Sequence, residues 1–136
     1  MIYLDTSAAA KAVLDESGTP AVRGLFDEGT EFVSSTLLAV ELHAVADRRF
    51  VQPDAVHEVI DRVALVSLGD DITTAAINLH SGLRTLDALH LATALRLGAA
   101  ITGILTFDKE LAGAAEQRGL SLHRVCETSD PTRTLT

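Results

Sequence analysis

The chain has 136 residues, of which 47% are hydrophobic and 22% are charged, which is enough for one domain with a sizeable core. The formal net charge of −8 argues against a general nucleic-acid binder, because counterion release from phosphates requires clustered Lys and Arg. The single cysteine allows no internal disulfide. The apolar runs are too short for a membrane span, and the amino terminus shows no leader pattern, so we expect a cytoplasmic protein.

Short apolar strands alternate with helices along the chain. In order, the expected elements are strand 2–4, a helix through residue 15, a helix beginning near residue 20, strand 31–34, helix 36–50, helix 53–63, strand 64–68, helix 72–81, helix 86–97, strand 101–105, helix 108–118 and an edge strand at 120–125. Thr6 or Ser7 and Thr85 are the expected caps of the first helix and of helix 86–97. This alternation indicates a parallel sheet covered on both faces, in a three-layer α/β/α architecture.

Glu41 is an ionisable residue in an apolar stretch of helix 36–50. Its neighbours three and four positions away are all leucine, alanine or valine, so an isolated carboxylate there would be costly. It needs a cation, hydrogen-bond donors or a proton. One interpretation is a structural ion pair with an arginine such as Arg84, and the other is a site shared with further acids.

Three aspartates are placed where they can join Glu41. Asp5 directly follows the first strand and Asp108 follows the fourth, so both lie at the carboxyl edge of the expected sheet. Asp87 is in the first turn of the helix before the fourth strand. Singly, Asp5 could close an Asx turn, Asp87 could complement the helix dipole and Asp108 could be an N-cap. As a set with Glu41, they predict one acidic cluster.

Such a cluster requires positive charge. Four carboxylates within roughly 5 Å repel by around 3 kcal/mol for each ionised pair at an effective dielectric of about 20. Oxygen ligands favour Mg²⁺ or Mn²⁺ over zinc, and two such ions would change the formal charge from −8 to −4. Because a metal activates water and neutralises phosphoryl charge, phosphodiester hydrolysis is the predicted reaction.

Four segments resemble PIN-domain ribonucleases, and more closely the VapC-type toxins of bacterial toxin–antitoxin pairs. They are IYLDTSA at residues 2–8, VEL at 40–42, GLRTLDALHLA at 82–92 and LTFDKEL at 105–111. The first and third segments are specific, whereas the second alone would be weak. Their order and spacing cover about residues 1–125, which we expect to form a PIN-like nuclease domain followed by a polar tail at 126–136.

The resemblance implies a five-stranded parallel sheet and an endoribonuclease that cleaves single-stranded regions of cellular RNA with Mg²⁺ or Mn²⁺. The metal ligands and catalytic acids would be Asp5, Glu41, Asp87 and Asp108. Asp5 would be the central ligand, and Glu41 would complete the metal shell or accept a proton from the attacking water. The resemblance also implies a homodimer and inhibition by a cognate VapB-type antitoxin.

Further polar residues near these acids are candidates for contacts with substrate or with metal-bound water. They are Thr6, Ser7, Thr106, Arg84, Lys11 and Lys109. The hydroxyl groups could equally cap helices, and the basic side chains could contact phosphate or remain solvated. His90, on an otherwise apolar helix, is interpreted as a core histidine that is hydrogen-bonded by backbone rather than as a general base.

Two other functions stay open. A PIN-like interaction module without catalysis would be indicated by a missing acid, and none of the four is missing. A structure-specific DNA nuclease shares the acidic chemistry but usually needs additional helices to thread DNA, for which this chain has no room. The sequence therefore favours the ribonuclease.

Overall fold

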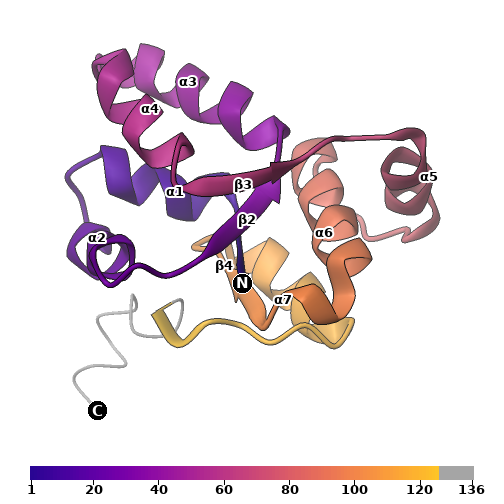
Figure 1. The fold of residues 1–136 in the computed structure, drawn as a ribbon. Coiled ribbons are helices and arrows are strands. Elements are labelled where there is room, and N and C mark those ends of the chain that lie inside the picture. Colours follow the sequence, from indigo (N-terminus) through magenta and orange to yellow (C-terminus); the bar gives the residue numbers. More distant parts are fainter. Residues whose placement is uncertain (126–136) are drawn as a thin grey trace.

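A computed structural model describes residues 1–125 of the chain (Figure 1). The strands are β1 (Ile2–Leu4), β2 (Phe32–Ser35), β3 (Val63–Val66) and β4 (Gly103–Leu105). The helices are α1 (Thr6–Val13), α2 (Thr19–Asp27), α3 (Leu37–Arg49), α4 (Pro53–Ile60), α5 (Asp70–Asn78), α6 (Thr85–Leu97) and α7 (Lys109–Gln117), with a 3₁₀ turn η1 (Gly98–Ala100) after α6. The predicted alternation of strands and helices is confirmed.

The sheet is parallel throughout, with the order β3-β2-β1-β4. It has four strands in the described part of the chain, so the predicted five-stranded sheet is wrong. The segment expected to form the fifth strand makes only a single parallel bridge, between Ile104 and Leu122. Residues 124 and 125 are already helical, which leaves too little extended chain for a longer ladder.

Side chains of the two central strands alternate between two cores, as expected for a sheet covered on both faces. Leu4 and Phe32 pack with apolar residues of α1, α2, α3 and α4, whereas Tyr3 and Val33 pack with those of α6 and α7. In Figure 1, α1–α4 lie on one side of the sheet, and α5, which packs against α6, lies with α6 and α7 on the other. The three-layer prediction is confirmed.

Aspartates begin two helices at the carboxyl edge of the sheet. Asp5, rather than the predicted Thr6 or Ser7, is the N-cap of α1, and Asp108 is the N-cap of α7. Their carboxylates accept hydrogen bonds from backbone N–H groups of the first helical turn. Each acid thus lies between the end of a strand and the start of a helix. Because β1 pairs with β4, the two acids lie at the ends of neighbouring strands.

Other boundaries differ modestly from the prediction. The helix expected to be capped by Thr85 begins at Thr85, and Arg84 occupies the cap position without a side-chain hydrogen bond. No helix of the described residues is long and apolar enough to cross a membrane. The expected polar tail at 126–136, which includes the one cysteine, lies outside the described residues.

Candidate active site

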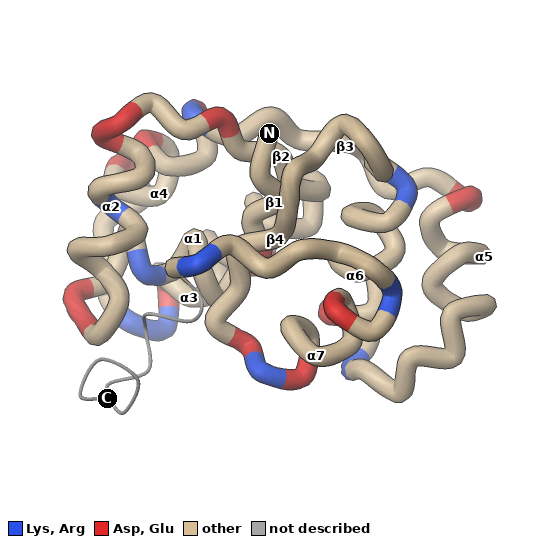
Figure 2. The backbone as a smooth tube through the Cα atoms, turned by 90° about the horizontal axis from the view of Figure 1, so that it is seen from below, with Lys and Arg blue, Asp and Glu red and all other residues tan. Residues whose placement is uncertain are grey.

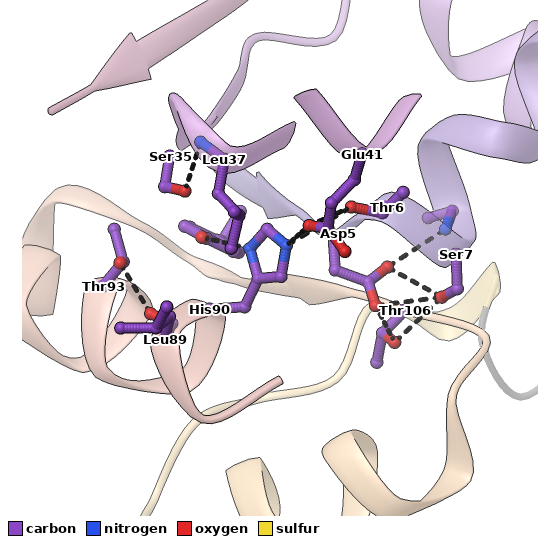
Figure 3. A network of polar contacts seen from close by, with 12 residues as sticks. Asp5, Thr6, Ser7, Ser35, Leu37, Glu41, Leu89, His90, Thr93 and Thr106 are labelled. Carbon is purple, nitrogen blue, oxygen red and sulfur yellow. Dashed lines mark hydrogen bonds and ion pairs between the residues drawn. The ribbon is translucent and has the colours of Figure 1, made fainter. Parts of the chain in front are cut away.

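Asp5 is a buried carboxylate held by hydroxyl groups from both sides of the sheet edge (Figure 3). Ser7 Oγ lies 2.8 Å from Asp5 Oδ1 and 3.0 Å from Oδ2, and Thr106 Oγ1 donates to Oδ2 at 2.7 Å. The backbone N–H of Ala8 donates to Oδ1 at 3.0 Å. With only 2% of its surface exposed, Asp5 has a fixed orientation.

The same hydroxyl groups hold the segment that follows β4. The backbone N–H of Phe107 donates to Ser7 Oγ at 2.8 Å, and that of Asp108 donates to Thr106 Oγ1 at 3.0 Å. These bonds connect the start of α1 with the start of α7. Ser7 and Thr106, predicted as candidates for contacts with substrate or metal-bound water, thus support the placement of two acids.

The environment of Asp5 disfavours its charged form. Burial raises the pKa of this carboxyl above its ordinary value, although the hydrogen bonds from Thr106 and Ala8 act in the opposite direction. A cation beside Asp5 would lower that pKa again. A buried acid of this kind is typical of functional sites, where desolvation and neighbouring charges are arranged around a reacting group or ion.

Asp87 lies within the electrostatic influence of two other acids. Burial, followed by the negative charges of Asp108 and Asp5, raises the pKa of Asp87 from 3.8 to about 6, and a hydrogen bond with Asp108 acts in the same direction. The charges of Asp5, which follows β1, and of Asp108, which precedes α7, therefore act on Asp87 in α6. That all four acids meet at one ion stays a prediction.

Glu41 reaches the site from α3 and is only partly buried, with 18% of its side chain exposed. Its Oε1 accepts a hydrogen bond from Thr6 Oγ1 at 2.7 Å and lies 2.7 Å from His90 Nε2. The other ring nitrogen of His90 lies 2.7 Å from Tyr3 Oη. The structure thus contradicts the suggested pairing of Glu41 with an arginine such as Arg84, because the side chain that its carboxylate contacts is a histidine.

The interpretation of His90 was half right. The ring is in the core, with 1% exposed, but its partners are side chains instead of the expected backbone groups. The sequence contained one usable signal, because a tyrosine in a buried strand and a histidine in a buried helix both need polar partners. It did not show that they pair with each other, or that Glu41 is the third member.

The acids of the candidate site do not form a complete set of metal ligands in this structure. In the part of the chain that the structure describes, no three His, Cys, Asp or Glu side chains are grouped so that they could hold one ion. The donor chemistry nevertheless fits a hard divalent cation, since the acids supply only oxygen. Such a cation would neutralise the charges of Asp108 and Asp5 that, together with the larger effect of burial, raise the pKa of Asp87. Small side-chain adjustments would be needed on binding.

The three basic candidates differ in availability. Lys11 Nζ pairs with Glu16 at 3.1 Å and lies 5.2 Å from the centre of the Phe107 ring, so it is already engaged. Arg84 and Lys109 are exposed and form no ion pair with a described residue. Figure 2 shows basic and acidic positions interspersed along the described chain.

A hollow of about 730 Å³ lies at the opposite edge of the sheet. It is lined by Met1, Phe32 and Val63 at the amino ends of β1, β2 and β3, together with side chains from the neighbouring loops. None of the four acids lines it. Because the strand carboxyl ends carry the titratable groups, the candidate site is assigned to the acidic edge and not to this hollow.

A family model and the sequences of related proteins assign the chain to the same family. The PIN domain family matches residues 2–117. Ribonuclease VapC35 of Mycobacterium tuberculosis is 38% identical over 130 residues, which are 90% of this chain and 95% of the relative. Ribonucleases VapC46 and VapC47 of the same organism are 32% and 31% identical, over 89% and 88% of this chain and 95% and 93% of the relatives.

A solved structure agrees with the fold. The crystal structure of VapC20 of Mycobacterium tuberculosis, described as a toxin that cleaves the sarcin-ricin loop, superposes with a TM-score of 0.70. The match covers 89% of this chain and 97% of that one at 18% identity, so it bears on the fold alone. From the sequence matches and the shared fold together, the chain belongs to the PIN domain family, within its group of VapC ribonucleases.

Proposed function

We propose that the protein is a metal-dependent endoribonuclease that acts as the toxin of a toxin–antitoxin pair and cleaves single-stranded regions of cellular RNA. The observation that supports this proposal is the position of Asp5, Asp87 and Asp108 at the carboxyl edge of the sheet, where burial and the charges of Asp108 and Asp5 raise the pKa of Asp87 to about 6. The relatives named as VapC ribonucleases support RNA as the substrate.

Asp5, Asp87 and Asp108 would hold Mg²⁺ or Mn²⁺, and Glu41 completes the acidic set. When bound, the ion supplies an activated water and neutralises charge on the phosphoryl group. Asp5 is the rigid member, because its two oxygens are already oriented by hydroxyl and backbone donors. Asp87 and Asp108 are less buried and can adjust their side chains toward the ion.

Glu41 is suited to take the proton from the attacking water. Both hydrogen bonds that it receives from described side chains end on Oε1, from Thr6 and from His90. Its other oxygen, Oε2, would accept the proton. Arg84 and Lys109, which are exposed at the starts of α6 and α7, are the basic side chains available to RNA phosphate.

The proposal includes the partners expected for this group of proteins. A cognate VapB-type antitoxin would bind the toxin and suppress its activity, and two copies of the chain would form a homodimer. Large apolar side chains exposed on the monomer are compatible with such contacts: Val40, Phe50, Ile77 and Leu86 are each more than 40% exposed. They lie on α3, at its end, on α5 and on α6, respectively.

The test is cleavage of RNA by the purified chain with Mn²⁺, beside the Asp5→Asn variant. Asparagine also caps helices well, so the variant should fold, yet it should lose at least about 100-fold in cleavage rate because a metal ligand is gone. Asp15→Asn is the matched control, since Asp15 is exposed in the loop after α1. Full activity of Asp5→Asn, or equal cleavage in EDTA, would refute the proposed metal chemistry.

A further inference from the structure

His90 is a core side chain whose contacts exceed what packing requires. It is 1% exposed, yet both ring nitrogens lie 2.7 Å from side-chain oxygens, Tyr3 Oη on one side and Glu41 Oε1 on the other. Tyr3 is fully buried, and its ring meets the imidazole edge to face at 74°. The three residues come from β1, α6 and α3, so the contacts run from the core to the site. Figure 3 shows the part between His90 and Glu41.

The direction of these hydrogen bonds follows from counting protons. An ionised carboxylate only accepts, so the short contact with Glu41 requires a proton on His90 Nε2. Thr6 has one hydroxyl proton and directs it to Glu41 Oε1, so it cannot supply His90. At neutral pH an ordinary tyrosine phenol carries its proton, so Tyr3 Oη, 2.7 Å from His90 Nδ1, can donate to that nitrogen.

The helix geometry connects this chain to the metal-binding acids. His90 follows Asp87 by three residues on α6, so the two side chains lie on the same face about one turn apart. Asp87 is partly exposed, whereas His90, about one turn further along α6, is buried and contacts Glu41. Without His90, Glu41 would keep only Thr6 as a hydrogen-bond donor among the described side chains.

We propose that Tyr3 and His90 are positioning residues that hold the Glu41 carboxylate through Oε1, so that Oε2 would be the oxygen available to a metal-bound water. Tyr3 fixes the ring tautomer by donating to Nδ1, and His90 in turn donates from Nε2 to Glu41. The inference rests on the proposed nuclease function for the role of Glu41, but the hydrogen-bond order itself does not.

The kinetic test compares His90→Gln with His90→Leu. The glutamine amide can still donate to Glu41, whereas leucine cannot, so His90→Leu should lower kcat by about 10–100-fold and His90→Gln by clearly less. KM for RNA should change little in both, because neither side chain reaches the substrate. His123→Leu is the matched control, a partly buried histidine elsewhere in the chain, and should retain the wild-type kcat.

A second measurement works without activity or metal. Long-range ¹H–¹⁵N spectra of the metal-free wild type should show a proton on Nε2 of His90 and none on Nδ1. In Tyr3→Phe, which removes the donor to Nδ1, a larger fraction of the molecules should carry a proton on Nδ1. A protonated Nδ1 with a bare Nε2 would overturn the relay, as would wild-type kcat in His90→Leu. If wild-type protein cleaves no RNA, the nuclease proposal fails, while the spectra still decide the hydrogen-bond order.

Discussion

Replacing Asp87 with asparagine should make the metal-free protein more stable at neutral pH, although the change removes a proposed metal ligand. Burial and the charges of Asp108 and Asp5 raise the pKa of Asp87 from 3.8 to about 6. A difference of about two pKa units corresponds to roughly 3 kcal/mol. Because Asp87 is partly exposed to water and salt, we expect about 1 kcal/mol, or ~3–5 °C in melting temperature for a chain of this size.

The sign of the pH dependence is fixed by the direction of this pKa change. Folded Asp87 binds its proton more tightly than the unfolded chain does, so its contribution is most favourable below pH 3.8 and declines as the pH rises through about 6. Asparagine does not titrate. The stability gained by Asp87→Asn should therefore be small near pH 4 and reach its full size above pH 7.

Thermal unfolding followed by circular dichroism in EDTA, at both pH values, measures this difference. The control is Asp15→Asn, which removes an exposed aspartate and should change the melting temperature little at either pH. If Asp87→Asn is less stable than wild type at pH 7.5, the folded structure favours the charged carboxylate. The three acids would then not repel one another, and the reasoning would be wrong.

Three further outcomes are expected. Millimolar Mn²⁺ should raise the melting temperature of the wild type by several degrees, since the ion binds only the folded chain, and an unchanged curve would count against convergence of the acids. Glu41→Gln should change the free energy of unfolding by no more than about 1 kcal/mol, because the amide oxygen accepts the same two hydrogen bonds. The variant should nevertheless cleave RNA at least tenfold more slowly. Marked destabilisation would instead indicate that Glu41 and His90 form a structural pair. Gly18→Ala should lower the free energy of unfolding by about 1–2 kcal/mol, because Gly18 has φ +90° and a Cβ there would lie 3.0 Å from the Phe107 ring. Urea unfolding measures this change, and an unshifted midpoint would show that the loop adapts to the alanine.

Most of the fold could be predicted because strand and helix patterns are local. Alternating apolar strands and helices indicated a covered parallel sheet, and β1 to β4 lie within about two residues of the predicted ranges. The prediction of a fifth strand was wrong because strand pairing depends on tertiary contacts, which a local sequence pattern does not show. Residues 120–125 are apolar enough for a strand, but whether they pair along their length depends on how the chain bends after Leu122.

The site was predictable to the extent that backbone position fixes it. Asp5 and Asp108 follow neighbouring strands, so their proximity follows from topology. The partner of Glu41 was not predictable in this way, because it depends on how α3 and α6 face each other across the sheet edge. A histidine on an apolar helix gives no sign of which neighbour it meets, and the arginine that seemed the natural partner lies exposed at the start of α6.

The most direct test of the proposed metal site is anomalous diffraction from a crystal of this protein soaked in Mn²⁺. The account predicts a peak among the carboxylates of Asp5, Asp87 and Asp108, with Glu41 still hydrogen-bonded to His90. A peak elsewhere on the molecule, or none at millimolar Mn²⁺ in a crystal whose acidic edge is open to solvent, would contradict it.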